Sequence, residues 1–379
     1  MNSQRSKFSI PKGVTYLNCA YMSPLLISVE KAGVKGLQRK RNPSLVSSQD
    51  FYTDGDVLRK EFAELINVQD PQRIAIIPSA SYGLASAARN IHLSRNDKMI
   101  VMAEQFPSNY YPWQRLAKDT GAELITVSPP NSLRDRGKTW NERILDAIDV
   151  KTRVVAMGNV HWADGTLFDL IQIRKRTLDV GALLIIDGTQ SVGALPFDVQ
   201  KIKPDALVCG GYKWLMGPYS IGMAYYSEVF NDGVPLEESW INRRDSEDFT
   251  SLVIYQNEYQ PGALRYDVGE HGNFILIPMM IEALRQIKRW QPENIQHYCR
   301  KISPIKKLRE LGCWIEDDNF RGQHLFGIRF PKDFPLSKVK ENMKKKKISV
   351  SFRGDSMRVA PNVYNDVSDF EKFIAALKP

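Results

Sequence analysis

Length, composition and charge limit what this chain is. It has 379 residues, of which 43% are hydrophobic and 25% charged, and a formal net charge of +9. These values are typical of a globular protein with one large domain and a smaller one, and no apolar run is long enough to span a bilayer. Neither a disulfide framework nor a metal site is expected, because no CxxC pairing occurs among the four cysteines, Cys19, Cys209, Cys299 and Cys313.

The N-terminal stretch MNSQRSKFSIPKG has no apolar core of the kind found in secretory signals. We therefore expect a cytoplasmic protein. Residues 1–15 are expected to return to the C-terminal part of the chain and to complete a small domain with residues 271–379. Residues 16–270 then form the large domain.

Between Arg73 and Ser227, short apolar runs alternate with helical patterns such as YGLASAARNIHL and FDLIQIRKRTLDVG. Because the runs read as continuously apolar, both faces of the sheet that they form are expected to be covered. This alternation predicts an α/β fold, a three-layer domain around a mostly parallel seven-stranded sheet. The seven runs are RIAIIP, MIVMAE, ELITVSP, RVVAMGNV, ALLIID, ALVCGG and IGMAYYS.

In a sheet of this kind the ligand binds outside the carboxyl ends of the strands. The residues that follow the runs are polar or aromatic, so these ends are the expected site. They are residues 79–82, 105–109, 159–164, 187–190 and 210–213.

From about Ile277 the chain changes to a long helical pattern that is interrupted at Pro292 and Pro304. The short apolar runs CWIED, HLFGIRF, ISVSFRG and SMRVAP follow, with further helical pieces around them. This texture predicts a smaller α+β domain at the C-terminus.

The basic run Lys344–Lys347 raises the possibility of a nucleic-acid partner. However, Leu336, Val339 and Met343 fall at helical spacing just before it, which predicts a surface helix with the lysines at its wet end. No nucleic-acid-binding motif accompanies the run. We therefore expect no nucleic-acid partner.

Lys213 lies between two predicted strands, in GGYKWLMGP. A buried ammonium is costly unless it is paired, neutralised or used covalently. Asp187 ends a neighbouring run, so both side chains are expected at one sheet edge. A lysine that forms a Schiff base and an aspartate that keeps a pyridine nitrogen protonated are what a pyridoxal phosphate site requires. The alternatives are a surface lysine, and an aspartate that only forms a cap or turn.

The segment SASYGLASAARN follows the run RIAIIP and opens a predicted helix. Backbone N–H groups at a helix N-terminus bind phosphate, and the Ser81 hydroxyl is an added donor. A serine in this place is equally compatible with a plain helix N-cap.

The segments DGTQSVGALPFDV and GGYKWLMGP together resemble the class V aminotransferases of pyridoxal phosphate fold type I. This group contains cysteine desulfurases, selenocysteine lyases, isopenicillin N epimerase and kynureninase. The resemblance extends to YLNCAYMSP, EQFPSNYYPW, RYDVGE and RVAPNVYN. It implies that pyridoxal 5'-phosphate is the cofactor, that the large domain binds it, and that the enzyme is a homodimer with shared active sites.

The resemblance also implies roles for single residues. Two residues also have a structural alternative. For Phe106 it is a plain core position. For Arg358, which sits near Arg353, it is that one of the two arginines is a structural ion-pair partner. His161 is expected to line the site, as a supporting or a catalytic residue. The implied roles are Lys213 for the Schiff base, Asp187 for the pyridine nitrogen, Gln190 for the phenolic oxygen, Phe106 over the ring face, Trp162 lining the site, Ser81 and Tyr212 for the phosphate, and Arg358 for the substrate carboxylate.

The chain departs from the family patterns in several places. Tyr212 stands where desulfurases have a histidine, and Gln190 stands where kynureninases have one. The segment KKKKISVSFRGDSMR lacks the cysteine that desulfurases carry there, and because persulfide transfer needs a thiolate, desulfuration is not expected. Glu270 occupies the place of a phosphate-binding threonine supplied by the second subunit. Trp240 is the candidate replacement.

The expected activity is a pyridoxal-phosphate-dependent transformation of an L-amino acid through an external aldimine and an α-carbanion. We expect transamination. The alternatives are a kynureninase-like β-lyase or hydrolase, an isopenicillin-N-epimerase-like epimerase, and a non-catalytic protein of the same fold. The motifs that bind the cofactor do not choose among these reactions, because all of them share the same first steps.

Overall fold

The computed structural model describes residues 1–378 of the chain. At its centre is a seven-stranded sheet in the order β2-β8-β7-β6-β5-β3-β4, in which β8 runs antiparallel to its neighbours. The expected α/β fold with a mostly parallel seven-stranded sheet is therefore confirmed. The strands are β2 (Ile74–Ile77), β3 (Lys98–Met102), β4 (Glu123–Val127), β5 (Thr152–Gly158), β6 (Leu183–Asp187), β7 (Ala206–Gly210) and β8 (Gly222–Tyr226).

Successive residues of a strand enter two different apolar cores, one on each face of the sheet. In β3, Ile100 and Met102 pack into one core, and Met99 and Val101 pack into the other. This alternation follows from the twofold period of a strand. It explains why the inner strands of the sheet are apolar at nearly every position, whereas the edge strand β4 has Glu123 and Thr126 exposed.

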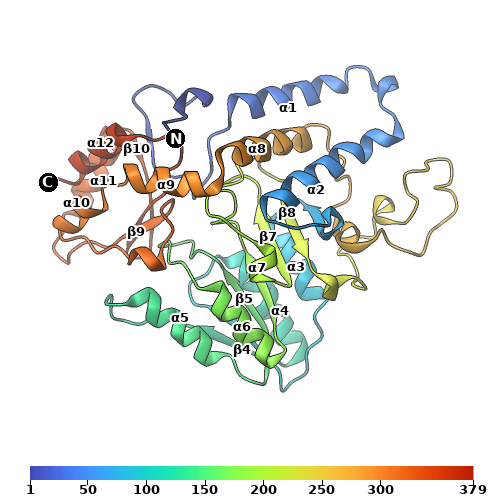
Figure 1. Ribbon diagram of the computed structural model, residues 1–379, viewed down its shortest axis with the longest axis horizontal. Helices are drawn as coiled ribbons and strands as arrows, with labels where there is room; N and C mark the ends of the chain where they lie inside the picture. The colour runs from blue at the N-terminus through green and yellow to red at the C-terminus, as the bar shows by residue number, and fades with distance from the viewer. Residues whose placement is uncertain (379) are drawn as a thin grey trace.

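Helices cover both faces of the sheet and give the fold its three layers (Figure 1). The helices of this part are α1 (Ile27–Arg39), α2 (Thr53–Leu65), α3 (Ala80–Arg89), α4 (Tyr111–Thr120), α5 (Arg136–Ala147), α6 (Leu170–Val180), α7 (Val199–Ile202) and α8 (Leu276–Trp290). Helix α1 packs on α8. Helices α3 and α4 pack on one face, and α2, α5, α6, α7 and α8 pack on the other. No helix within residues 1–378 is long and apolar enough to cross a membrane.

The chain after α8 forms a smaller α+β part, on the left of Figure 1. Its helices are α9 (Pro292–Ile302), α10 (Ile305–Glu310), α11 (Leu336–Lys345) and α12 (Val367–Leu377). Its antiparallel sheet has the order β11-β12-β9, with β9 (Phe326–Ile328), β11 (Ser351–Arg353) and β12 (Ser356–Val359).

The N-terminal strand β1 (Thr15–Tyr16) pairs in parallel with β10 (Ile348–Ser349), so the start of the chain lies against its C-terminal part. Both termini lie at this end of the molecule (Figure 1). The domain boundaries at residues 15 and 270 stay a prediction.

The long helical pattern is interrupted where the sequence predicts. Helix α8 ends at Trp290, and Pro292 opens α9. Pro304 is the residue before α10. Proline has no N–H group to donate, and it is therefore tolerated at a helix start and not in a helix interior.

The surface helix expected around the basic run is α11. Val339 and Met343 are buried, and Lys344–Lys347 are exposed at its C-terminal end. Leu336 differs from the predicted stripe and is 37% exposed, because it is the first residue of the helix and its turn faces solvent.

Asp267 connects its own segment and helix α2 to the end of β2, where the expected site begins. Its Oδ1 accepts a hydrogen bond of 2.6 Å from the backbone N–H of Ile76. Its other oxygen forms an ion pair with Arg59 of α2, and both of these side chains are buried. Arg59 also binds Asp56 at 3.1 Å, but the Asp56 side chain is exposed.

We expect Asp267→Asn to lower the free energy of unfolding by about 3 kcal/mol or more, because it leaves a buried guanidinium without its buried carboxylate. The matched control is Asp56→Asn, which removes the exposed partner of the same arginine and should cost less than about 1 kcal/mol. Urea unfolding of both variants measures the difference. Equal effects would show that the buried pair has no special role.

Candidate active site

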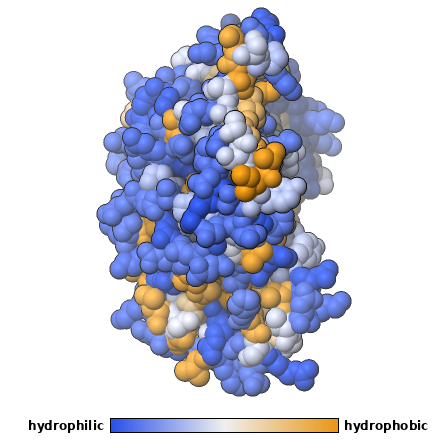
Figure 2. Space-filling model, turned by 90° about the vertical axis from the view of Figure 1, so that its right-hand side faces the viewer, coloured by the Kyte–Doolittle hydropathy of each residue, from blue (hydrophilic) through white to orange (hydrophobic). Residues whose placement is uncertain are grey.

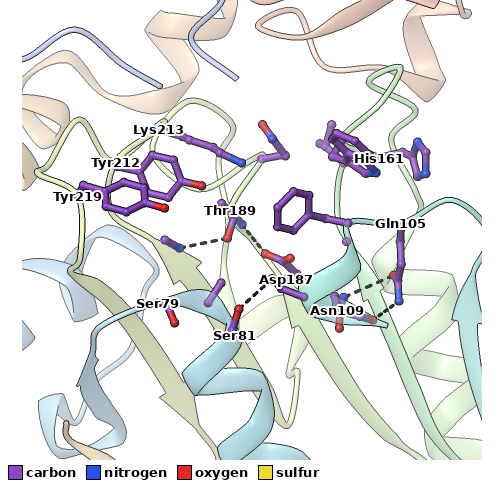
Figure 3. Close-up of a pocket in the computed structure, with 18 of the residues that line it drawn as sticks. Ser79, Ser81, Gln105, Asn109, His161, Asp187, Thr189, Tyr212, Lys213 and Tyr219 are labelled. Atoms are coloured by element: carbon purple, nitrogen blue, oxygen red, sulfur yellow. Dashed lines mark hydrogen bonds between the residues drawn. The ribbon is translucent and has the colours of Figure 1, made fainter. Parts of the chain in front are cut away.

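A cavity of about 280 Å³ lies at the carboxyl ends of the central strands. Polar and aromatic side chains from several strand ends point into it (Figure 3). Its location agrees with the rule that ligands of such sheets bind outside the carboxyl ends of the strands. Residues that line it include Ser79, Ser81, Gln105, Phe106, Ser108, Asn109, His161, Trp162, Asp187, Thr189, Gln190, Tyr212, Lys213 and Tyr219.

Lys213 enters this cavity from the segment after β7. Its side chain is only 5% exposed, and its Nζ lies 5.2 Å from the ring centre of Phe106 and 5.3 Å from that of Tyr212. Burial lowers the pKa of Lys213 to about 8; the charge of Asp187 opposes this shift, whereas that of Arg358 adds to it. A neutral amine is therefore accessible near physiological pH.

Asp187 is the last residue of β6, next to β7 in the sheet. Because parallel strands end at the same edge, it shares the cavity with Lys213. Its Oδ1 accepts a hydrogen bond of 3.0 Å from the N–H of Thr189. Burial raises the pKa of Asp187, so a cationic group beside it would favour its charged form.

The N-terminal turn of α3 forms the floor of the cavity. Ser79, not Ser81, is the N-cap, since its Oγ accepts a hydrogen bond of 3.2 Å from the N–H of Tyr82. Ser81 lies two residues further on, and its hydroxyl donates to Ser108 Oγ at 2.8 Å. The first N–H groups of this ten-residue helix face the cavity end and provide anion-binding donors.

Gly83 allows α3 to approach the sheet closely. A Cβ added at Gly83 would lie 2.8 Å from Val208 Cγ1 and 2.9 Å from Ile77 Cδ1. Both neighbours belong to strands of the central sheet and cannot move easily. The glycine in SASYGLAS therefore sets the position of the helix start.

Gln190 is held at both ends of its amide. Its Oε1 accepts from Trp214 Nε1 at 2.9 Å, and its Nε2 donates to the carbonyl of Ala20 at 3.1 Å. His324 Nε2 donates to the Gln190 carbonyl at 2.8 Å, and Gln296 Nε2 donates to His324 Nδ1 at 2.9 Å. Burial lowers the pKa of His324 to about 4, which agrees with this neutral form.

Arg358 of β12 is buried, with 1% of its surface exposed. Its Nη1 donates to the carbonyl of Trp162 at 2.7 Å, and its Nε has no hydrogen-bond partner among the described residues. Burial and the nearby charge of Arg353 lower the pKa of Arg358 to about 10, so it stays a cation at neutral pH. Trp162 in turn lies edge-to-face against Phe106 at 5.4 Å.

His161 lines the cavity but is committed to a buried network. Its Nδ1 lies 3.3 Å from Asp164, whose carboxylate also forms a 2.9 Å ion pair with Arg136. Burial opposes the charged form of Asp164, but His161 and Arg136 outweigh it and hold the pKa of that carboxyl far below its usual range. The Nε2 of His161 lies 3.3 Å from the carbonyl oxygen of Ala103, whereas its Nδ1 has no hydrogen-bond partner among the described residues. His161 is thus packed into the wall of the cavity.

The structure brings most of the residues singled out by sequence to this one cavity. Arg358 contacts the cavity wall at Trp162. Trp240 is not among the described residues that line the cavity. It is 42% exposed and packs on Phe249. The residues that do line it are Ser81, Phe106, Trp162, Asp187, Gln190, Tyr212 and Lys213.

Other residues of the cavity had no role assigned from the sequence. Ser79, Ser108 and Thr189 lie in the strand-end segments, so their proximity could be foreseen but not their bonds. Thr189 Oγ1 accepts from the N–H of Gly210 at 3.1 Å and joins the ends of β6 and β7. Tyr219, which packs on Tyr212 at 4.7 Å, lies outside those segments. Only the turn-forming Gly-Pro before it marks this region.

No cysteine lines the cavity in the described part of the chain, and all four thiols are buried. Cys19 is close enough to Lys213 for its charge to affect the pKa of that lysine. Its Sγ accepts from Asn362 Nδ2 at 3.4 Å, and burial raises its pKa to about 11. It is therefore a protonated, packed thiol at neutral pH.

The chain is similar in sequence to known proteins. The chain is 25% identical over 310 residues to an uncharacterized aminotransferase of Bacillus subtilis, which covers 81% of this chain and 78% of that protein. It is 26% identical over 285 residues to a probable cysteine desulfurase of Methanothermobacter thermautotrophicus, which covers 74% of this chain and 68% of that protein.

Solved structures share the fold. An apo cysteine desulfurase from Thermococcus onnurineus matches with a TM-score of 0.82 at 21% identity and covers 100% of this chain and 98% of its own. A variant of C-DES with glycine linked covalently to its PLP cofactor matches with a TM-score of 0.86 at 18% identity and covers 99% of this chain and 98% of its own. At these identities the likeness establishes the fold.

A family model described as aminotransferase class-V matches residues 42–241. This range is more than half of the 379 residues, and it contains the ends of β2, β3, β5, β6 and β7 that line the cavity. The chain therefore belongs to the class V aminotransferase family of enzymes.

Proposed function

We propose that this enzyme transfers the amino group of an L-amino acid and uses Lys213 to hold pyridoxal 5'-phosphate covalently. The observation that carries the proposal is the buried amine of Lys213, whose pKa is lowered to about 8, in one cavity with Asp187. Pyridoxal phosphate is the cofactor of the family to which the chain belongs.

The residues of the cavity fit this cofactor. Asp187 is suited to bind the ring nitrogen, because its buried carboxylate gains most from a cationic partner. The N–H groups of the first α3 turn, with Ser79 and Ser81, are suited to the phosphate. Phe106 and Gln190 are assigned to the ring face and the phenolic oxygen.

Three residues of the chain, Lys213, Asp187 and Arg358, have separate roles in the proposed reaction. When bound, pyridoxal phosphate supplies an aldehyde that bonds to amines and a ring that accepts electrons. The Nζ of Lys213, about half of which is neutral at pH 8, would take and carry the proton of the substrate α-carbon. The carboxylate of Asp187 would hold the ring nitrogen in its protonated form. Arg358 binds the substrate carboxylate, a task that suits its free Nε and planar fork.

The thiols favour transamination over desulfuration. A desulfurase needs a thiolate that reaches the substrate, whereas the four thiols here are buried and outside the cavity. A hydrolase or an epimerase would use the same lysine and aspartate, so these alternatives are separated by experiment.

A second copy of the chain is the proposed partner of an exposed apolar segment between residues 243 and 260. This segment, gold in Figure 1, projects from the body, and its Val253, Ile254 and Tyr255 are 83%, 64% and 93% exposed. Figure 2 shows orange apolar groups on that side of the molecule. Exposed apolar runs commonly mark contact surfaces. The expected role of Trp240, as the replacement for a phosphate-binding threonine from the second subunit, requires such a homodimer. The cytoplasmic location of the protein stays a prediction.

The activity is tested by the visible spectrum of the pyridoxal-phosphate-loaded protein mixed with a panel of L-amino acids and no keto acid. We expect one or a few amino acids to convert the cofactor stoichiometrically to its pyridoxamine form, and a keto acid to restore it. Turnover of an amino acid without this conversion would contradict transamination, and its products would identify a lyase, a hydrolase or an epimerase.

The lowered pKa of Lys213 predicts the pH dependence of its reactivity. In the cofactor-free protein, the rate at which an amine-acylating reagent modifies Lys213 should rise through about pH 8 and then level off, since only the neutral amine reacts. Asp187→Asn should move this midpoint down, and Arg358→Leu should move it up, because the first removes a negative and the second a positive charge. Peptide mass spectrometry locates the modified lysine.

A midpoint near that of a free lysine, about 10.4, would contradict the account. So would shifts of the two variants in the same direction.

A further inference from the structure

Arg353 and Arg358 lie on the same face of the hairpin formed by β11 and β12. In its register Ser351 pairs with Arg358, and Arg353 pairs with Ser356. Arg353 is two residues from Ser351 on the same strand, so its side chain points to the same side as that of Arg358. Such diagonal neighbours are roughly 7–8 Å apart at the backbone, within reach of long side chains.

Both guanidinium groups approach Trp162, which lines the cavity. The central carbon of Arg353 lies 5.3 Å from the Trp162 ring centre, and that of Arg358 lies 5.9 Å from it. The charges of both arginines also act on the amine of Lys213, where they lower its pKa. The two cations therefore lie on the Trp162 side of the cavity, next to the residues that line it.

No carboxylate within residues 1–378 forms an ion pair with either arginine. The side-chain hydrogen bonds of Arg353 and Arg358 go to the carbonyls of Phe352 and Trp162. The nearby acidic residues have other partners, since Asp164 pairs with Arg136 and Asp355 with Arg329. Two like charges held this close are unfavourable unless an anion joins them.

The phosphate of the cofactor does not explain both charges. Its proposed place, the first turn of α3, lies at the foot of the cavity with Ser79 and Ser81, while His161, the neighbour of Trp162, lies on the other side (Figure 3). If the substrate α-carboxylate binds Arg358, the guanidinium of Arg353 is left for a second anionic group.

We propose that Arg353 binds a second carboxylate, at the end of the substrate side chain, and that the preferred substrate is an acidic L-amino acid. This inference rests on the proposed function, in which Arg358 binds the α-carboxylate. Aspartate and glutamate carry two carboxylates a few bonds apart, which matches two arginines on one hairpin face. Arg353 is only partly buried, and Gly354 and Asp355 form the hairpin end beside it, so its long side chain has room to meet substrates of either length.

The test is calorimetric binding of dicarboxylates without an amino group to the pyridoxal-phosphate-loaded protein. The probes are succinate and glutarate, each compared with its monoamide, so that no chemistry takes place. We expect one of the diacids to bind about tenfold or more tightly than its monoamide, as a lost charge-assisted hydrogen bond implies. Arg353→Gln should abolish this preference, and Arg353→Lys should restore part of it.

Two comparisons make the test specific. Arg134→Gln, at a side chain that is 91% exposed and outside the cavity, should keep the preference. Arg358→Leu should weaken diacid and monoamide alike. Equal affinities for diacid and monoamide in the unchanged protein would overturn the inference. An Arg353→Gln variant that dissociates into single chains but keeps the preference for the diacid would overturn it too, because Arg353 would then serve a subunit contact.

The amino-acid panel separates this inference from the proposed function. If neutral amino acids convert the cofactor and acidic ones have no advantage, the inference alone fails. If no amino acid converts it, the proposed transamination fails, and the acidic substrate fails with it.

Discussion

The amine of Lys213 lies where its charged form is poorly solvated, and much of the surrounding structure determines how that charge is handled. Burial alone lowers the pKa of this side chain, and the arginines of the small β11/β12 sheet lower it further, while Asp187 opposes them. The balance leaves an amine that is neutral for part of the time at neutral pH. A lysine of this kind is a nucleophile and a base, which a surface lysine is not.

The parallel sheet is what brings these groups together. Strands that run in the same direction end at the same edge, so Asp187 at the end of β6 and Lys213 after β7 line one cavity although they are 26 positions apart in the sequence. Gly83 lets the start of α3 come close to the same edge, and Asp267 holds the end of β2 that leads to it. The arginines come from the far end of the chain, through the β11/β12 hairpin and its contact with Trp162.

Features that depend on local pattern could be predicted from the sequence. The seven apolar runs, the helix breaks at Pro292 and Pro304, and the grouping of strand-end residues around Lys213 all follow from periodicity and proline chemistry. The side-chain bonds could not be foreseen, because they depend on packing between distant segments. Thus Arg353 meets Trp162 only through the register of a hairpin. The cap of α3 is local, but whether Ser79 or Ser81 forms it depends on the residue at which the helix begins, and helix ends are not fixed by pattern alone.

The central claim, that Lys213 carries the cofactor, is tested most directly by borohydride reduction of the pyridoxal-phosphate-loaded protein followed by peptide mapping. The account predicts one pyridoxyl group per chain, on the peptide that contains Lys213. Lys213→Ala should lose the trapped group and keep its fold, and the exposed Lys118→Ala should retain it. A pyridoxyl group on another lysine, or one retained in Lys213→Ala, would contradict the account.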